Sequence, residues 1–558
     1  MSDTTAQAQG SGTGPISEAE AEEHVSGICF KHGPPRRVGI ELEWLVHDAA
    51  DPARPIAPQR LAAAFAGAKR QPMSGQLSLE PGGQWELSSQ PADSLAECLS
   101  AADRDLGRMA AAAAAAGLRL AGLGAEPDLP PRRTLDLPRY AAMEEYFDRH
   151  GHWGRVMMCS TASVQVNLDA GLDGDLLGHP AADPAAYPSA DFDPGPDSAH
   201  RAPHGPAGRP GERERWDLPQ GLDPGRERGS DPAHQTPRGP AGSGSSSGSG
   251  ERDRRNLPPG FDPGPDPARP APHNPLGQRE RWDLLHDLGP VLVAAFANSP
   301  LLNGRPTGWR STRQAVWAHL DPGRTLAPLP HRAAGTGADG AGTRGLRTAW
   351  TDYVLNAELM CVRRPHGPWT APPGLTFRDW LRSTGPDRPT RADLDYHLST
   401  LFPPVRPRGH FELRVVDAQQ GGAWQVVAAL VTALLDDPAA ADAARAAVEP
   451  LCAPESASTV AGRPVGAGER GPRGAVWLRA ARLGPADPAL RAAAEECFDL
   501  ALAALPRLGA PAPAATAVAA YAERYVRRGR CPADDRLDAL SGPSRRPEPR
   551  RAEEISWS

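Results

Sequence analysis

Four short segments of the chain alternate apolar and polar residues with a repeat of two. In residues 37–44, Val38, Ile40, Leu42 and Trp44 are apolar, and the residues between them are polar or glycine. This period predicts a β-strand with one face buried and the other polar. The pattern recurs at 84–88, 163–168 and 410–415. We therefore expect four half-buried strands that display carboxylate, amide and cationic groups on a common polar face.

Other segments have the composition and periodicity of helices. The first covers residues 16–31, where Ser17 and Glu20 have the spacing of a capping box. Five more are predicted at 93–116, 282–296, 421–435, 488–505 and 514–527. Together the elements indicate an α+β fold, in which helices back a largely antiparallel sheet and the polar face of that sheet is free to hold a ligand.

Residues 173–279 break this pattern. The block is dense in Pro, Gly, Asp, Arg and Ser and has almost no apolar periodicity, so it cannot bury enough surface to offset the entropy of ordering. It also repeats itself, since Phe192-Asp-Pro-Gly-Pro-Asp197 returns as Phe261-Asp-Pro-Gly-Pro-Asp266. Two copies indicate an expanded loop rather than a solenoid. We predict one catalytic domain over 16–540, interrupted by this disordered insertion and flanked by disordered ends at 1–15 and 541–558.

Charge and cysteine content exclude several classes of partner. The formal net charge is -7 and the pI is about 6.2, so no basic field is expected for nucleic acid or an anionic membrane. The seven cysteines include no Cys-x-x-Cys pair, which argues against a disulfide framework or a zinc site. The N-terminus does not look like a secretory signal, and no run is apolar enough to span a bilayer. We expect a cytoplasmic protein.

Glu41 and Glu43 share the polar face of the first predicted strand. Like charges about 4 Å apart repel by about 4 kcal/mol at an effective dielectric near 20. The alternatives for relieving this repulsion are an ion pair with Arg37, a raised pKa, or a hard divalent cation. Further polar residues on the same kind of face or an adjoining turn are Glu80, Glu86, Gln165, Asn167 and Glu412. Because no glycine-rich phosphate loop ending in Gly-Lys-Ser/Thr is present, phosphate chemistry here requires metals and arginines.

These residues lie in segments that resemble glutamate–cysteine ligases of the plant and actinobacterial type. The core segments are Val38-Gly-Ile-Glu-Leu-Glu43, Leu79-Glu-Pro-Gly-Gly-Gln-Trp-Glu-Leu-Ser88 and the segment from Met157 to Asp169. Residues 297–300, 304–313, 375–378 and 397–406 agree in the same order. The likeness runs from about residue 20 to about 420 without the insertion. It is strongest to the actinobacterial branch that feeds ergothioneine biosynthesis.

The resemblance implies a glutamine-synthetase-like core, in which the sheet curves around ATP and two or three Mg²⁺ ions. It implies that glutamate and cysteine are joined through a γ-glutamyl phosphate to give γ-glutamylcysteine. The metal ligands carried over from the family are Glu41, Glu43, Glu80, Glu86 and Glu412. Gln165 and Asn167 are placed in or beside that shell, Arg414 on a nucleotide phosphate, and Arg313 on the substrate carboxylate or transferred phosphoryl group. Tyr353 is placed among the substrate contacts.

Two departures from the family pattern leave alternatives open. Asn356 and Glu358 stand where the family more often has Asp and Pro, which bears on the substrate contacts near Tyr353. One alternative is a different carboxylate–amine ligase on the same core, and another is a non-catalytic binding homologue. The retained carboxylates favour an enzyme. Outside this set, Cys159 is interpreted as a small buried hydrophobe, His410 as a hydrogen-bonding strand residue, and Trp309 and Trp317 as core aromatics.

Overall fold

The computed structural model describes residues 14–31, 37–149, 151–172, 276–326, 328, 341–385, 387–452 and 471–541, all within one compact unit. Most of the predicted disordered segments lie outside these residues. Their predicted boundaries are wrong where they overlap the described part: Pro15 forms a β-bridge, Leu172 pairs with Gly277, and a helix begins at Gln278, inside the proposed 173–279 insertion. Ser541, assigned to the tail, ends the last helix.

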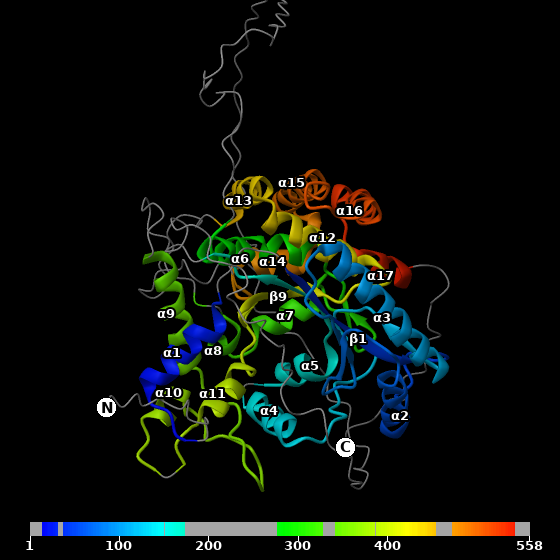
Figure 1. The fold of residues 1–558 in the computed structure, drawn as a ribbon. Coiled ribbons are helices and arrows are strands. Elements are labelled where there is room, and N and C mark those ends of the chain that lie inside the picture. Colours follow the sequence, from blue (N-terminus) through cyan, green and yellow to red (C-terminus); the bar gives the residue numbers. More distant parts are fainter. Residues whose placement is uncertain are drawn as a thin grey trace, which may run out of the picture. The chain divides into compact units, whose positions relative to one another are not determined.

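A seven-stranded antiparallel sheet organises the described chain (Figure 1). Its order is β2-β3-β1-β5-β9-β8, and β4 pairs with the C-terminal end of β1. The strands are β1 (Val38–Asp48), β2 (Gln76–Leu79), β3 (Trp85–Ser88), β4 (Leu118–Ala121), β5 (Ser163–Asp169), β8 (Val405–Pro407) and β9 (His410–Asp417). All four strands predicted from alternation are confirmed, as is the α+β class. A separate hairpin joins β6 (Leu301–Leu302) to β7 (Arg305–Pro306).

The apolar face of the sheet packs on helices. Ile40, Leu42 and Leu413 are each 1 % exposed, because α3 (Leu95–Ala115), α6 (Gln278–Ala295) and α12 (Ala423–Asp436) cover this side. Behind them lie α13 (Pro438–Cys452), α14 (Ala475–Leu483), α15 (Pro488–Ala504) and α16 (Ala512–Arg524). Three further helices are α1 (Glu18–Cys29), α2 (Pro58–Lys69), which packs on α3, and α17 (Pro532–Ser541). The predicted helices are confirmed with ends shifted by a few residues, and the Ser17–Glu20 capping box is present.

The polar face of the sheet is also covered, so the expectation of half-buried strands is wrong. Glu41 is 7 % exposed, Gln165 1 % and Glu412 0 %. Segments distant in sequence fold over this face and were not predicted as helices: α4 (Pro138–Asp148), α5 (Trp153–Ser160), α7 (Thr312–Ala318) and α11 (Arg391–Leu398). Nearby lie α8 (Pro322–Thr325), α9 (Ala341–Asn356) and α10 (Phe377–Leu381). Within the described ranges, none of the helices has both the length and the apolar composition to cross a bilayer.

Candidate active site

The strand register brings the predicted carboxylates of β1 and β3 together. Glu43 lies directly opposite Glu86, and Glu41 lies opposite Gln165 on the other neighbouring strand. The two amides on β5 bind the same pair: Gln165 Nε2 donates to Glu43 Oε1 at 2.8 Å, and Asn167 Nδ2 donates to Glu41 Oε1 at 3.1 Å. The carboxylates and amides of β1, β3 and β5 therefore form one continuous polar surface.

Glu80 joins this surface through a turn that only glycine permits. Gly83 adopts φ +94° in the Pro81-Gly82-Gly83 turn, a region that favours glycine. A Cβ placed on Gly82 would lie 2.0 Å from the Cys159 carbonyl oxygen, so the turn packs directly against the C-terminal end of α5. The close approach explains the two glycines and holds Glu80 beside β1 and β3.

Three of the carboxylates, Glu41, Glu80 and Glu86, lack sufficient positive charge around them. Burial, followed by the neighbouring Glu43, raises the pKa of Glu80 to about 7. Burial, and then the charges of Glu80, Glu41 and Glu43, raise the pKa of Glu86 well above its ordinary value. Burial and Glu412 raise the pKa of Glu41. The Arg37 pairing considered from the sequence is not what relieves this repulsion, because the arginines that favour ionised Glu41 belong to the β8–β9 hairpin.

Glu412 behaves differently from these three carboxylates. Arg406 donates from Nε to Oε2 at 2.7 Å and from Nη2 to Oε1 at 2.9 Å, and Arg414 also donates to Oε1. Burial disfavours ionisation of Glu412, but Arg406, Arg414 and Arg408 outweigh it and hold its pKa below the ordinary range. Glu412 is thus already neutralised, and its contacts give the predicted metal ligation no support.

Arg313 and Arg414 are held in place by the chain around them. Arg414 Nη1 donates to Gln165 Oε1 at 2.7 Å. Arg313 Nη2 donates to the Arg414 carbonyl oxygen at 2.8 Å, and its guanidinium lies 4.6 Å from the centre of the Trp317 ring. These contacts use one side of each guanidinium and fix its position, which suits the anion-binding roles predicted for both.

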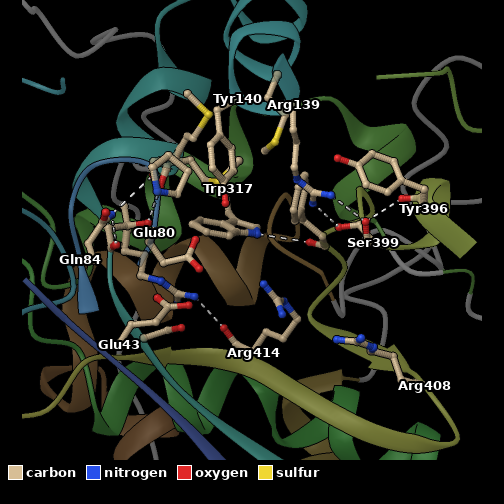
Figure 2. A pocket seen from close by; sticks show the side chains of 18 of the residues that line it. Glu43, Glu80, Gln84, Arg139, Tyr140, Trp317, Tyr396, Ser399, Arg408 and Arg414 are labelled. Atoms are coloured by element: carbon tan, nitrogen blue, oxygen red, sulfur yellow. Dashed lines mark hydrogen bonds between the residues drawn. The ribbon is translucent and has the colours of Figure 1, made fainter. Parts of the chain in front are cut away.

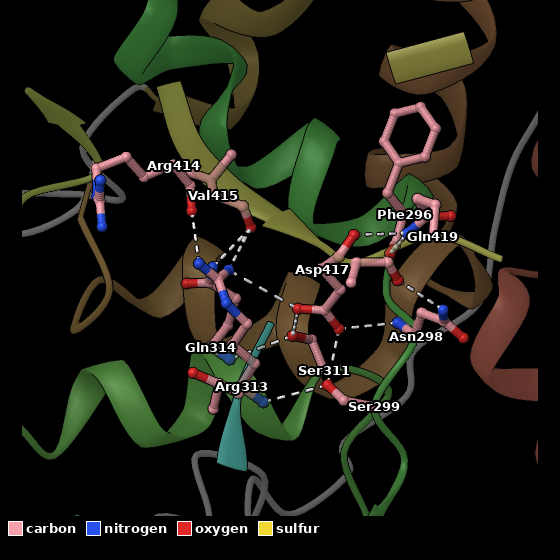
Figure 3. Close-up of polar contacts among 12 residues, drawn as sticks. Phe296, Asn298, Ser299, Ser311, Arg313, Gln314, Arg414, Val415, Asp417 and Gln419 are labelled. Carbon is pink, nitrogen blue, oxygen red and sulfur yellow. Dashed lines mark hydrogen bonds and ion pairs between the residues drawn. The ribbon is translucent and has the colours of Figure 1, made fainter. Parts of the chain in front are cut away.

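Asp417, the last residue of β9, binds the N-terminal end of α7 beside Arg313 (Figure 3). Its carboxylate accepts from Asn298 N at 2.9 Å, Ser299 Oγ at 2.7 Å and Ser311 Oγ at 2.9 Å. The Arg313 Nη1 atom is 3.9 Å from Asp417 Oδ1. Because Ser311 is the N-cap of α7, one buried carboxylate ties this helix and its arginine to the sheet.

A cavity of about 700 Å³ lies between the polar face and the covering helices (Figure 2). Four predicted residues line it: Glu43, Glu80, Arg313 and Arg414. The other predicted sheet residues (Glu41, Glu86, Gln165, Asn167 and Glu412) do not line it; those on β1, β5 and β9 hydrogen-bond to lining residues, to each other, or both. Residues not predicted for the site also line it, namely Arg139, Arg363, Tyr396, Arg408 and Trp317. Of these, only Trp317 had been considered, with a place in the core favoured over a place in a pocket wall; the others lie outside the alternating segments that revealed the carboxylates.

Tyr353 lies apart from this cavity. It belongs to α9, stacks near Trp350 with ring centres 5.2 Å apart, and borders a second hollow of about 270 Å³. The two departures from the family pattern are structural here, since Asn356 Oδ1 accepts from Arg378 and Glu358 Oε2 accepts from the Gly374 amide. Neither departure alters the wall of the large cavity.

Cys159 and His410 have no catalytic character in this arrangement. Burial raises the pKa of the Cys159 thiol to about 12, so it stays protonated and is a poor nucleophile. Burial lowers the pKa of His410 to about 4, which leaves the ring neutral. Neither residue lines the cavity.

The donor set fits a hard divalent cation by its chemistry. Glu41, Glu43, Glu80 and Glu86 are oxygen donors that repel one another, and Mg²⁺ prefers oxygen ligands. In the arrangement seen over the described ranges, no three carboxylate, imidazole or thiolate groups already surround a common point where an ion would sit. Closing the set around a cation therefore requires side-chain rotation.

Comparison with known proteins gives the family. Residues 37–176 and 272–554 match the model of glutamate–cysteine ligase family 2. The chain belongs to this family. The unmatched stretch falls within the predicted insertion of this ligase. Its relatives include glutamate–cysteine ligase EgtA of Mycobacterium tuberculosis (strain ATCC 25618 / H37Rv), 31% identical over 93% of this chain and 90% of that protein.

Two further relatives extend the comparison. EgtA of Mycolicibacterium smegmatis is 31% identical over 94% of this chain and 92% of its own. The chloroplastic glutamate–cysteine ligase of Brassica juncea is 25% identical over 63% of this chain and 48% of its own. Both kinds of relative suggested by the motifs are thus found, and the likeness to EgtA covers far more of the ligase.

Proposed function

We propose that this ligase joins the γ-carboxylate of glutamate to the amino group of cysteine, using ATP and Mg²⁺, and that the γ-glutamylcysteine enters ergothioneine biosynthesis. The observation that carries the proposal is the cavity itself, which Glu43 and Glu80 line together with Arg313 and Arg414, and in which burial and Glu43 raise the pKa of Glu80. The EgtA relatives support the choice of substrates and pathway. We propose a cytoplasmic enzyme that acts on small molecules, without a nucleic-acid or membrane partner.

The metal site that we propose is formed by Glu41, Glu43, Glu80 and Glu86, whose mutual repulsion a cation relieves. Two or three Mg²⁺ ions would neutralise phosphoryl oxygens of the nucleotide in this position. Gln165 and Asn167 orient two of the carboxylates through their amide hydrogen bonds. Glu412 is proposed to act through Arg406 and Arg414 instead of binding metal.

In the proposed first step, the glutamate γ-carboxylate attacks the γ-phosphorus of ATP, and the bond to the bridging oxygen breaks to release ADP. Arg313 and Arg414 hold the transferring oxygens and stabilise the charge that develops on them. Since the two guanidiniums are already fixed by Arg414 O, Gln165 and Trp317, they need little rearrangement during the reaction.

In the second step, the cysteine amino group attacks the carbonyl carbon of the acyl phosphate. The C–N bond forms, the C–O bond to phosphate breaks, and inorganic phosphate leaves with the proton that the amine loses. No covalent enzyme intermediate is needed. The cavity holds amine and acyl phosphate together, and such positioning supplies on the order of 7–11 kcal/mol.

An ADP-release assay tests the proposed function. Glutamate and ATP–Mg²⁺ are supplied with cysteine or with each of several other amines, and the product is identified by mass. We expect ADP and γ-glutamylcysteine to form in equal amounts with cysteine. Turnover with a different amine only would identify another carboxylate–amine ligase, and no turnover with any amine would indicate a binding homologue.

The stability of the metal-free protein is expected to fall as pH rises from about 5 to 8. The pKa of Glu80 in the folded protein, about 7, lies above the pKa of the same carboxyl group in the unfolded chain. The contribution of Glu80 to the free energy of unfolding is therefore fully present below the unfolded pKa and is lost as pH rises through about 7. Mg²⁺ binds the deprotonated groups, so its stabilising effect should grow over the same range. Thermal unfolding with EDTA or with Mg²⁺, at about pH 5 and at about pH 8, measures both trends. An equal stabilisation by Mg²⁺ at the two pH values would contradict the proposed metal site.

The block within 173–279 is proposed to be an insertion without a catalytic role. The family match omits residues 177–271, and loops tolerate added length at small entropic cost. Deleting residues 191–270 is therefore expected to leave kcat and each KM within about twofold of the full chain. A folded deletion variant with no activity would assign a function to this block.

A further inference from the structure

The last helix of the described chain, α17, is attached to the two loops that lead into and out of the β6–β7 hairpin. In the first loop, Asn298 Oδ1 accepts from Arg536 Nε of the helix at 2.9 Å. In the second loop, Arg310 Nε donates to Asp534 Oδ1 of the helix at 2.6 Å. The loops also pair with each other, since the Ser299 amide donates to the Arg310 carbonyl oxygen at 3.0 Å. The C-terminal helix therefore contacts both loops where they lie side by side.

Asn298 connects α17 to the support of Arg313. The Asn298 backbone amide donates to Asp417 Oδ2 at 2.9 Å, and its Nδ2 atom donates to the carbonyl oxygens of Gly122 and Ala418, each at 2.7 Å. Asp417 binds the N-terminal end of α7, the helix that carries Arg313 (Figure 3). A shift of Asn298 is therefore transmitted through Asp417 to the arginine that lines the cavity.

Arg536 is the hydrogen-bond donor to the Asn298 side-chain oxygen. Asn298 is 1 % exposed, and over the ranges that the structure describes no other group donates to its Oδ1 atom. A buried oxygen without a donor is unfavourable, so the loop is expected to move if Arg536 is lost. The Arg536 side chain is half-buried, and none of the described carboxylates forms an ion pair with it. The hydrogen bond from Nε, and not the charge, is thus the interaction that this residue supplies.

We propose that Arg536 is a positioning residue, which acts through Asn298 and Asp417 to hold Arg313 in the orientation that the transferring phosphoryl group requires. The proposal rests on the proposed ligase function, in which Arg313 stabilises charge that develops in the transition state. Arg536 does not line the cavity. An interaction that serves the transition state alone changes kcat and leaves ground-state binding of the substrates almost unchanged.

Two substitutions of similar shape separate the hydrogen bond of Arg536 from its charge. The side-chain nitrogen of glutamine is bonded to Cδ, as Nε is in arginine, so Arg536→Gln can still donate to Asn298. Methionine has a side chain of similar length without a donor. We expect Arg536→Met to lower kcat about tenfold or more, while the KM values for ATP, glutamate and cysteine stay within about twofold. Arg536→Gln should keep at least about half of the wild-type kcat.

Hydrogen exchange followed by mass spectrometry gives a readout that does not require activity. Peptides covering residues 297–318 contain both loops and α7. Their amides should exchange faster in Arg536→Met than in the wild type or Arg536→Gln, because the loops lose a support.

Arg530→Met is the matched control. Arg530 lies just before α17, and its Nη2 atom pairs with Asp535 Oδ1 at 3.1 Å and Asp538 Oδ2 at 2.6 Å. Its ion pairs support the helix itself and do not involve either loop. This substitution should leave both kcat and the exchange of residues 297–318 unchanged.

Three results would overturn the proposal: unchanged exchange of residues 297–318 in Arg536→Met, an equal fall of kcat in the Met and Gln variants, or a raised KM with kcat unchanged. If Arg536→Met does not fold, Arg536→Gln still decides, since a kcat lower by about tenfold in that folded variant contradicts a hydrogen-bond role. A wild-type protein that forms no γ-glutamylcysteine would contradict the ligase function instead, and the exchange comparison would still test the link from Arg536 to α7.

Discussion

Glu86→Ala is expected to abolish Mg²⁺-dependent ADP release from ATP, glutamate and cysteine while the protein stays folded. Glu86 lies opposite Glu43 in the sheet, and its strongly raised pKa, caused by burial and then by Glu80, Glu41 and Glu43, shows that it lacks a counter-charge. Removing it relieves repulsion in the metal-free protein but takes a ligand from the proposed cation site. We expect kcat/KM to fall by about 100-fold or more, equivalent to about 2.7 kcal/mol of transition-state stabilisation.

Glu97→Ala is the control for the Glu86 variant. It removes the same charge from an exposed position in the first turn of α3, and activity should be unchanged. Circular dichroism and thermal unfolding of the Glu86 variant should match the wild type. Full Mg²⁺-dependent activity in Glu86→Ala would remove this residue from the metal site.

Glu412→Ala is expected to lose activity for a different reason, because it destabilises the fold. Glu412 is 0 % exposed and accepts hydrogen bonds from both Arg406 and Arg414. Its removal leaves two buried guanidiniums without their carboxylate partner, and breaking a buried ion pair in this way costs about 3–5 kcal/mol. Urea and thermal unfolding should show this loss, in contrast to Glu86→Ala. From the sequence alone the two substitutions appear equivalent.

Glu412→Gln provides the graded comparison. The glutamine side chain has nearly the same shape as glutamate and keeps one acceptor oxygen, but it loses the charge. The free energy of unfolding of Glu412→Gln should therefore lie between those of the wild type and Glu412→Ala. If Glu412→Ala unfolds like the wild type yet binds Mg²⁺ more weakly, Glu412 is a metal ligand after all and Arg406 is held by other contacts.

Elements governed by local pattern were predictable from the sequence. The two-residue alternation of β1, β3, β5 and β9 survives in the structure because opposite faces of a strand meet different surroundings. The Ser17–Glu20 capping box depends only on residues three apart, and it forms as expected. Helices such as α5 and α7, with 8 and 7 residues, are too short for a clear period and were missed.

The basic wall of the cavity was not predictable from such patterns. Arg139, Arg363 and Tyr396 come from separate segments, and each is an ordinary polar residue in its own neighbourhood. They meet because α4, α11 and the chain before α10 fold over the sheet. Trp317 lines the same cavity, although the sequence placed it in the core.

The sequence by itself determined that Glu41 and Glu43 share one face of their strand and that Gln165 and Asn167 share one face of theirs. Pairing of β1 with β5 in the tertiary structure then placed the four side chains together. Only the tertiary structure decided the state of each carboxylate. Arg406 is the register partner of Glu412 across β8 and β9, whereas Glu80 and Glu86 have other carboxylates as neighbours. Electrostatic energy depends on distance through space and on burial, and neither quantity is contained in the order of residues along one strand.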